Sequence, residues 1–249
     1  MTVRYAVYGL PGALTPDPLR PLAEAWIGRS VDGRPVTAAV PAGWTRDELD
    51  ALTVDARRYG FHATLKAPFR LADGRDVAEL DVRVARLAAD LPPVVVPRIA
   101  LRRLGGFYAL IAGAPAPGLH ALAAAVVRTL DDLRAPLTAA DRARRHPERL
   151  SPRQRALLDT WGYPYVLDEF LAHLTLTDRI DERDRPRVSA ALAEHFTGHL
   201  DRDVPIEALC VFVEPEPGAP FTLRSAHPLG GTPIHPSEPA AAGHREGEA

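Results

Sequence analysis

The sequence is short of several features that define large classes of protein. It has a single cysteine, Cys210, which excludes an intrachain disulfide and a cysteine-rich zinc site. It has no apolar run of about 18 residues, so we expect no membrane span. Its first residues, MTVRYAVYGLPG, lack the basic and then apolar order of a signal peptide. Together these absences predict a cytoplasmic protein.

An excess of charge of one sign is also absent. The 249 residues carry a formal net charge of −2 at pH 7, and the pI is near 6.5. A protein that coats nucleic acid is strongly basic, so this class is disfavoured, although a local basic cleft is compatible with the composition. The remainder is ordinary for a globular protein, with 46% hydrophobic and 25% charged residues.

Lysine is nearly missing from the chain. Lys66 is the one lysine among 30 basic residues, and all the others are arginines. An ammonium and a guanidinium group are not interchangeable. We therefore expect Lys66 to lie where a compact cation is needed, with chance as the alternative.

The order of predicted elements indicates an α+β fold with mainly antiparallel sheet. Alternating and β-branched stretches predict strands at 3–10, 61–70, 94–103, 107–113, 170–178, 205–213 and 220–227. Helical periodicity and capping signals predict helices at 18–27, 46–56, 76–89, 117–133, from 138, from 151 to before Gly162, and at 182–198. Residues 28–43 are expected to form a loop.

The predicted elements form one domain, 1–229, with two similar halves. Residues 3–113 and 114–228 each contain a strand, a helix and then a pair of strands, and exchange of strands between the halves is left open. Residues 230–249 are rich in Gly, Pro, Ala and Glu, so we expect a disordered tail.

Two predicted strands carry the same short motif. One is Phe61-His62-Ala63-Thr64-Leu65, and the other, 111 residues later, is Ala172-His173-Leu174-Thr175-Leu176. Two further His-x-Ser/Thr matches, at His195 and His235, lie outside predicted strands, so the strand context carries the signal. Alternate residues of a strand share a face. Each motif therefore presents an imidazole and then a hydroxyl on one face, and apolar residues on the other.

Two imidazoles and two hydroxyls suit in-line cleavage of a phosphodiester. One imidazole takes a proton from the nucleophile and the other gives one to the leaving oxygen, which histidine can do near neutral pH. Hydroxyls donate to the non-bridging oxygens, where negative charge is held, and Lys66 or an arginine neutralises that charge. No metal is required by this scheme.

The paired motifs resemble the signature of the two-histidine (2H) phosphoesterase superfamily, the LigT-like proteins. This resemblance implies a bilobal α+β fold, with two pseudo-symmetric lobes of mainly antiparallel sheet and helices around a central cleft. It implies that His62 and His173 are the acid–base pair of a cyclic phosphodiesterase, and that Thr64 and Thr175 bind the phosphate. It implies neither a cofactor nor a metal.

Longer phrases around the motifs resemble a narrower branch of that superfamily. These are RYGFHATLKAPF at 58–69 and GYPYVLDEFLAHLTLTDRI at 162–180. Members of the branch are uncharacterised and are often encoded among phosphonate-utilisation genes. The branch implies a cyclic ribose phosphate or a phosphonate-pathway intermediate as substrate, whereas the wider superfamily implies a 2′,3′-cyclic nucleotide.

Charged and aromatic residues near the motifs are candidates for substrate binding. They are Tyr59, Lys66, Tyr165 and Arg179. Each is equally compatible with a packing or surface role. Arg144 and Arg145 lie on an arginine-rich predicted helix and could contact an anionic ligand, but a solvated helix face is the simpler interpretation.

Other functions remain open at this stage. His195 and His199 are four residues apart beside Glu194, a spacing that can bind zinc, although Gly198 indicates that the helix is ending. The same cleft could serve a non-catalytic module that binds a nucleotide or an RNA end. It could also serve an RNA 2′–5′ ligase-type activity, but the near-neutral charge gives little support for a long RNA partner. The oligomeric state cannot be inferred.

Overall fold

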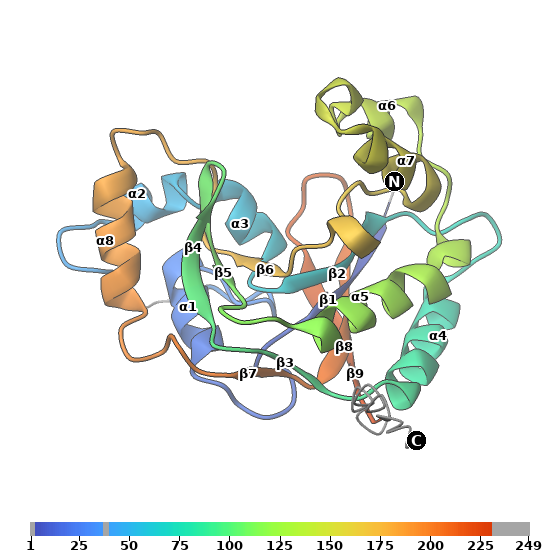
Figure 1. The fold of residues 1–249 in the computed structure, drawn as a ribbon, viewed down its shortest axis with the longest axis horizontal. Coiled ribbons are helices and arrows are strands. Elements are labelled where there is room, and N and C mark those ends of the chain that lie inside the picture. The colour runs from blue at the N-terminus through green and yellow to red at the C-terminus, as the bar shows by residue number, and fades with distance from the viewer. Residues whose placement is uncertain (1–2, 37–39, 231–249) are drawn as a thin grey trace, which may run out of the picture.

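The computed structural model describes residues 3–36 and 40–230, and a seven-stranded antiparallel sheet forms its centre (Figure 1). Two short strands, β3 (Val94–Val96) and β7 (Val204–Ile206), form a separate antiparallel pair. The seven strands, in their order across the large sheet, are β4 (Ala100–Leu104), β5 (Phe107–Ile111), β6 (His173–Thr175), β2 (Ala63–Phe69), β1 (Arg4–Gly9), β8 (Ala208–Glu214) and β9 (Thr222–Pro228). The predicted α+β class with mainly antiparallel sheet is confirmed.

Strands from the two halves of the sequence alternate in position across the large sheet and do not form two separate blocks. β6 comes from the second half and lies between β5 and β2, which come from the first. β8 also comes from the second half, and it pairs with β1. The boundary between residues 113 and 114 therefore divides the chain by sequence order and not by position in the sheet.

Helices lie around the sheet in three groups (Figure 1). One group gathers near β4, a second contacts β2, β3, β8 and β9, and a third stands above the second. The first group is α1 (Leu19–Ile27), α2 (Arg46–Ala51), α3 (Val54–Tyr59) and α8 (Arg185–His195), the second is α4 (Val77–Asp90) and α5 (Pro117–Thr129), and the third is α6 (Ala139–Ala143) and α7 (Pro152–Trp161).

Local signals explain several helix ends. Thr45 and Ser151 each form a capping box, in which the hydroxyl accepts a hydrogen bond from the backbone N–H three residues later. Gly28 and Gly162 end α1 and α7 with φ angles of 76° and 75°. That left-handed conformation favours glycine, which has no Cβ.

Three predicted elements are each divided into two in the structure. The helix expected at 46–56 is two helices, and the Thr53 hydroxyl donates to the Leu49 carbonyl (2.8 Å) where α2 ends. The strand expected at 94–103 is divided into β3 and β4 around Arg98, whose φ is 46°. The strand expected at 205–213 is likewise divided into β7 and β8.

Burial along β2 differs from the sequence pattern on one face. Phe61, Ala63 and Leu65 are buried, as expected for the apolar face. His62 and Lys66, which the strand alternation places on the polar face, are only 8% and 3% exposed. β2 is a central strand with cover on both sides, so polar side chains here need partners inside the protein.

Two further expectations concern the ends of the chain and the membrane. The tail expected from 230 onward lies outside the described residues from 231 on, and so does part of the 28–43 loop, at 37–39. In the described part of the chain, every helix is too short or too polar to span a bilayer.

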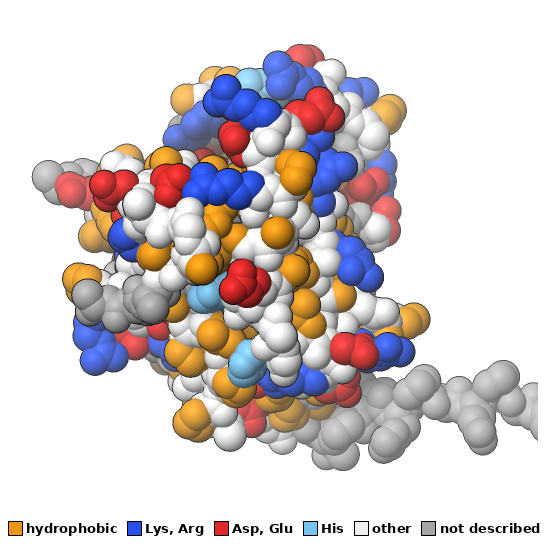
Figure 2. All heavy atoms as spheres, turned by 90° about the vertical axis from the view of Figure 1, so that its left-hand side faces the viewer, with side chains coloured by type: hydrophobic (Ala, Val, Ile, Leu, Met, Phe, Trp, Pro, Cys, Tyr) orange, Lys and Arg blue, Asp and Glu red, His pale blue; other side chains and the backbone are white. Residues whose placement is uncertain are grey.

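The surface carries charge unevenly. Figure 2 views the side that bears α8 and β4. Lys and Arg side chains crowd the top of that view, at the height where α6 and α7 stand in Figure 1. A chain with little net charge thus concentrates basic side chains locally.

We predict that Trp26→Phe lowers the free energy of unfolding by about 1–3 kcal/mol, because the buried Leu176 carbonyl loses its donor. Trp26 is fully buried on α1, and its indole N–H donates to that carbonyl (3.0 Å), just after β6. Chemical denaturation measures the change. Trp44→Phe, at a half-buried tryptophan, is the matched control, and an equal loss in both variants would contradict the role of the hydrogen bond.

Candidate active site

The two histidine motifs lie on neighbouring antiparallel strands. Ala63 of β2 pairs with Leu174 of β6. Continuing this register by one residue in each direction places His62 opposite Thr175 and Thr64 opposite His173. Residues directly opposite on antiparallel strands point to the same face, with Cβ atoms about 4.5–5.5 Å apart. The pairing therefore brings all four side chains to one face of the sheet, with the two histidines at a diagonal spacing of about 7–8 Å.

The imidazole of His62 is held by bonds at both ring nitrogens. Nδ1 lies 2.8 Å from the Gly60 carbonyl oxygen, and Nε2 lies 3.1 Å from the Thr64 hydroxyl. A carbonyl can only accept, so Nδ1 carries the proton and Nε2 accepts from Thr64. Nε2 is thus the basic nitrogen on the motif face.

Gly60 is required for this arrangement. Its φ is 79°, and a Cβ placed there would lie 2.8 Å from Val31. Any side chain would be strained by the backbone and would also collide with a buried neighbour. The turn at Gly60 ends α3 and aims a carbonyl at His62.

His173 is held in the same way. Its Nδ1 lies 2.8 Å from the Leu171 carbonyl oxygen, again two residues earlier in the chain. Nδ1–H donates to that carbonyl, which leaves Nε2 free to act. The two motifs therefore have the same spacing of histidine and threonine. In both, a backbone carbonyl two residues before the histidine orients its ring.

The two histidines differ in burial. Tyr8 of β1 stacks on His62 with ring centroids 3.7 Å apart, and Phe212 packs nearby at 6.2 Å. This burial lowers the pKa of His62 to about 4, opposed by the bond to Gly60 and assisted by the neighbouring His173. His173 is half-buried, and its ring lies 5.8 Å from that of Phe107. His62 is thus a neutral imidazole at neutral pH, deeper in the site than His173.

Two cavities meet over this face of the sheet. One, of 460 Å³, is lined by His62, Thr64 and Thr175, and the other, of 520 Å³, is lined by Thr64 and His173. Phe107 and Tyr163 line both cavities. The motif face is therefore the floor of a continuous cleft of a size typical for small-molecule sites.

Three lining residues were missed by the sequence analysis, namely Tyr8, Phe107 and Tyr163. Tyr8 pairs with Thr64 across β1 and β2, a register that the sequence does not reveal. Tyr163 contacts Tyr165 edge to face, with ring centroids 5.6 Å apart, inside the quoted phrase GYPY. That phrase could have indicated Tyr163 as well, but the sequence analysis selected only Tyr165 from it.

The predicted binding residues lie at different places. Tyr59 and Arg179 line the cavity beside His62, and Tyr165, 46% exposed, lines the cavity beside His173. Lys66 lines neither cavity and instead donates to Asp131 (2.9 Å). Burial lowers the pKa of Lys66, and Asp131 opposes that change. The structure thus brings Tyr59, Tyr165 and Arg179 to the cleft but holds Lys66 in an ion pair beside it.

The alternative zinc interpretation finds no support in the packing of its residues. His195 Nε2 lies 2.8 Å from the Leu22 carbonyl oxygen, and its ring packs on Trp26. Among residues 3–36 and 40–230, no group of three or more His, Cys, Asp or Glu side chains is arranged to hold a metal ion.

A comparison with known protein families shows to which of them the chain belongs. The family described as "Protein of unknown function (DUF1045)" matches residues 64–222, which include both threonines and His173. The chain belongs to the DUF1045 family. The description of this family names no reaction.

Two curated relatives are similar to most of the chain. One, from Janthinobacterium sp. (strain Marseille), is 37% identical over 233 residues, which are 92% of this chain and 51% of that protein. The other, from Laribacter hongkongensis (strain HLHK9), is 40% identical over 227 residues, 89% of this chain and 50% of that protein. Both are named ribose 1,5-bisphosphate phosphokinase PhnN. The DUF1045 chain spans about half the length of these relatives.

Two solved structures bear names from the class that the motifs resemble. E. coli LigT complexed with NADP+ has a TM-score of 0.42 and 13% identity, and the match covers 92% of this chain and 98% of LigT. A structure titled phosphoesterase has a TM-score of 0.40 and 15% identity over 92% and 99%. Scores this low carry no argument about the reaction of the DUF1045 protein.

We predict that the imidazole of His62 titrates with a midpoint near pH 4 in an NMR titration. Because the unfolded imidazole has a pKa near 6.5, the neutral buried ring contributes stability above that pH and loses it as pH falls toward 4. The loss between pH 7 and pH 4 is roughly 3 kcal/mol. Urea unfolding of the wild type and of His62→Gln at both pH values isolates this contribution, since carboxyl groups titrate in both proteins. An equal loss in the two proteins would contradict the buried neutral state.

Proposed function

We propose that this protein is a phosphodiesterase that hydrolyses a cyclic or small phosphodiester. The observation that carries the proposal is the cross-strand pairing of the motifs, which places His62 beside Thr175 and Thr64 beside His173 on the floor of one cleft. Acid and base on either side of a phosphorus atom are what in-line displacement needs.

The difference in burial supports a role for each histidine. A base must be neutral before reaction, and burial holds the pKa of His62 at about 4. His62 Nε2 takes a proton from water as the water oxygen forms its bond to phosphorus. The bond from phosphorus to the leaving oxygen breaks, and protonated His173 gives its Nε2 proton to that oxygen. Atoms and charge balance without a further reactant.

The threonines complete the scheme. When substrate binds, the Thr64 hydroxyl turns its proton from His62 Nε2 to a non-bridging oxygen, which frees the Nε2 lone pair for the water proton. The Thr175 hydroxyl points to the same face and can donate to another non-bridging oxygen as negative charge builds. The proton transfers and the oxygen contacts are all made by side chains of this chain. We therefore propose that hydrolysis needs no metal.

The names of the relatives support a substrate class. Ribose 1,5-bisphosphate is the compound in the name of both curated relatives. Hydrolysis of a 1,2-cyclic phosphate of ribose 5-phosphate at the 2-oxygen would produce this compound. We therefore propose a cyclic ribose phosphate as the first substrate to test, with a link to phosphonate metabolism, and a 2′,3′-cyclic nucleotide as the second.

We predict that the wild type hydrolyses a member of a cyclic sugar phosphate and cyclic nucleotide panel in the presence of a chelator. His62→Ala and His173→Ala should each lower kcat/KM by about 100-fold to 10,000-fold, the usual contribution of acid–base catalysis. His227→Ala is the matched control, because this histidine bonds to Ser225 on β9, away from the cleft, and it should keep full activity.

The same assay decides between the alternatives. Activity abolished by the chelator would overturn the metal-free scheme. Binding of panel members without turnover would favour a nucleotide-binding module, and joining of RNA ends would favour ligase-type activity.

We predict that the acidic limb of kcat/KM against pH lies near 4, because the free enzyme needs His62 neutral. Tyr8→Ala should admit water around His62 and move this limb upward toward 6.5. Rates measured from pH 3.5 to 9 test both expectations. A wild-type limb at 6.5, or a limb that Tyr8→Ala does not move, would show that His62 is not the base.

A further inference from the structure

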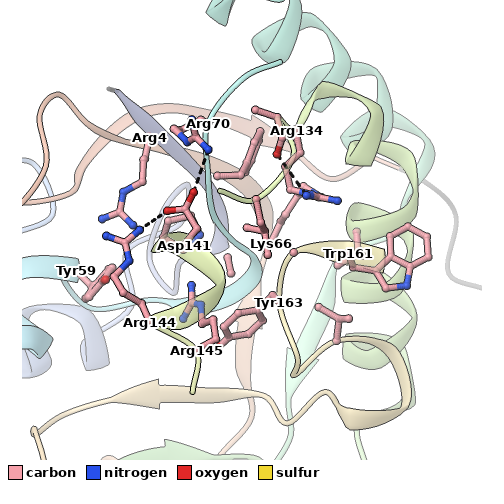
Figure 3. Close-up of a pocket in the computed structure, with 18 of the residues that line it drawn as sticks. Arg4, Tyr59, Lys66, Arg70, Arg134, Asp141, Arg144, Arg145, Trp161 and Tyr163 are labelled. Atoms are coloured by element: carbon pink, nitrogen blue, oxygen red, sulfur yellow. Dashed lines mark hydrogen bonds and ion pairs between the residues drawn. The ribbon is translucent and has the colours of Figure 1, made fainter. Parts of the chain in front are cut away.

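A third cavity adjoins the two-histidine cleft and has a different character. It has a volume of 310 Å³ and shares Tyr59, Ala67, Arg145 and Tyr163 with the cavity beside His62. α6, which stands above the sheet, supplies one wall (Figures 1 and 3). We call this cavity the arginine pocket, after the cations that line it: Arg4, Arg58, Lys66, Arg70, Arg134, Arg144 and Arg145.

Six of these seven cations share three carboxylates, two to each. Arg4 and Arg58 both pair with Glu214, which is fully buried. The other two pairs follow the same rule, because Arg70 and Arg144 pair with Asp141, and Lys66 and Arg134 pair with Asp131. Each carboxylate cancels one of its two cations. Every cluster therefore keeps one positive charge in excess.

The seventh cation, Arg145, adds a further positive charge. Its guanidinium lies over the ring of Tyr163, 4.8 Å from the ring centroid. The two side chains are neighbours in Figure 3. No carboxylate within the described residues pairs with it. Asp55 is the other acid on the wall, besides Asp141. The pocket thus stays strongly positive even when each acid is counted against it.

This excess positive charge costs free energy unless an anion neutralises it. Positive groups held together repel one another, and a half-enclosed site screens them less than open solvent does. Guanidinium groups match the oxygens of a phosphate and donate to them in pairs. A phosphomonoester carries close to two negative charges near pH 7, so it suits a pocket with several unbalanced cations.

We propose that the arginine pocket binds a second, terminal phosphate on the substrate whose phosphodiester lies over the histidines. This inference rests on the proposed function and narrows its substrate class to phosphorylated phosphodiesters. Ala67 lines all three cavities, and it lies roughly 10 Å along β2 from Thr64. One sugar unit between the two phosphates is compatible with this spacing.

The test compares adenosine 2′,3′-cyclic phosphate with and without a 5′-phosphate. We predict that the wild type prefers the 5′-phosphorylated compound in kcat/KM by about ten-fold or more. Arg145→Gln and Arg70→Gln should bring that ratio toward one. Arg149→Gln is the matched control, because Arg149 is exposed beside α6 but does not line the pocket, and it should keep the ratio.

A binding measurement separates failure of this inference from failure of the proposed function. Calorimetry with ribose 5-phosphate on the His62→Ala/His173→Ala protein needs no turnover. Hydrolysis of both nucleotides at equal kcat/KM would overturn the arginine pocket and leave the phosphodiesterase standing. If neither nucleotide is hydrolysed, binding that Arg145→Gln abolishes and Arg149→Gln keeps would still support the pocket. Equal binding in all variants would overturn it.

Discussion

The pairing of β2 with β6 is the constraint on which the site depends. The two strands come from distant parts of the chain, and a single register, Ala63 opposite Leu174, decides which side chains meet. A slip of one residue would turn one motif into the core and leave the other facing solvent. The neighbours on both sides, β1 and β5, hold this register. Their buried apolar side chains make any slip costly.

Two similar motifs have become chemically different through their surroundings. Both rings are oriented by a carbonyl two residues earlier, so local geometry is the same at His62 and His173. Tyr8 and Phe212 enclose only His62. Removal of water penalises the charged imidazole, and a carbonyl acceptor at Nδ1 does not fully offset that cost. Near-symmetry in sequence is thus compatible with separate acid and base roles.

The cleft and the arginine pocket adjoin one another but differ in the charge of the residues that line them. Over the histidines, Phe107 and Tyr163 line both cavities, and the charged residues of the lining include acids as well as arginines. Beside them, paired cations share single carboxylates, an arrangement that orders the guanidinium groups and still leaves net positive charge. A chain with a net charge of −2 can therefore present a strongly basic pocket, because its charges are not spread evenly over the protein.

The sequence by itself determined the fold class, most element positions and the two motif strands, because periodicity, capping boxes and the His-x-Thr-Leu repeat are local signals. Only the tertiary structure decided the insertion of β6 between β5 and β2, the burial of His62 and the placing of Lys66 against Asp131. It also decided the cluster around Arg145 and Tyr163. These features depend on contacts between residues far apart in the chain, and on water excluded by packing, neither of which a local pattern encodes.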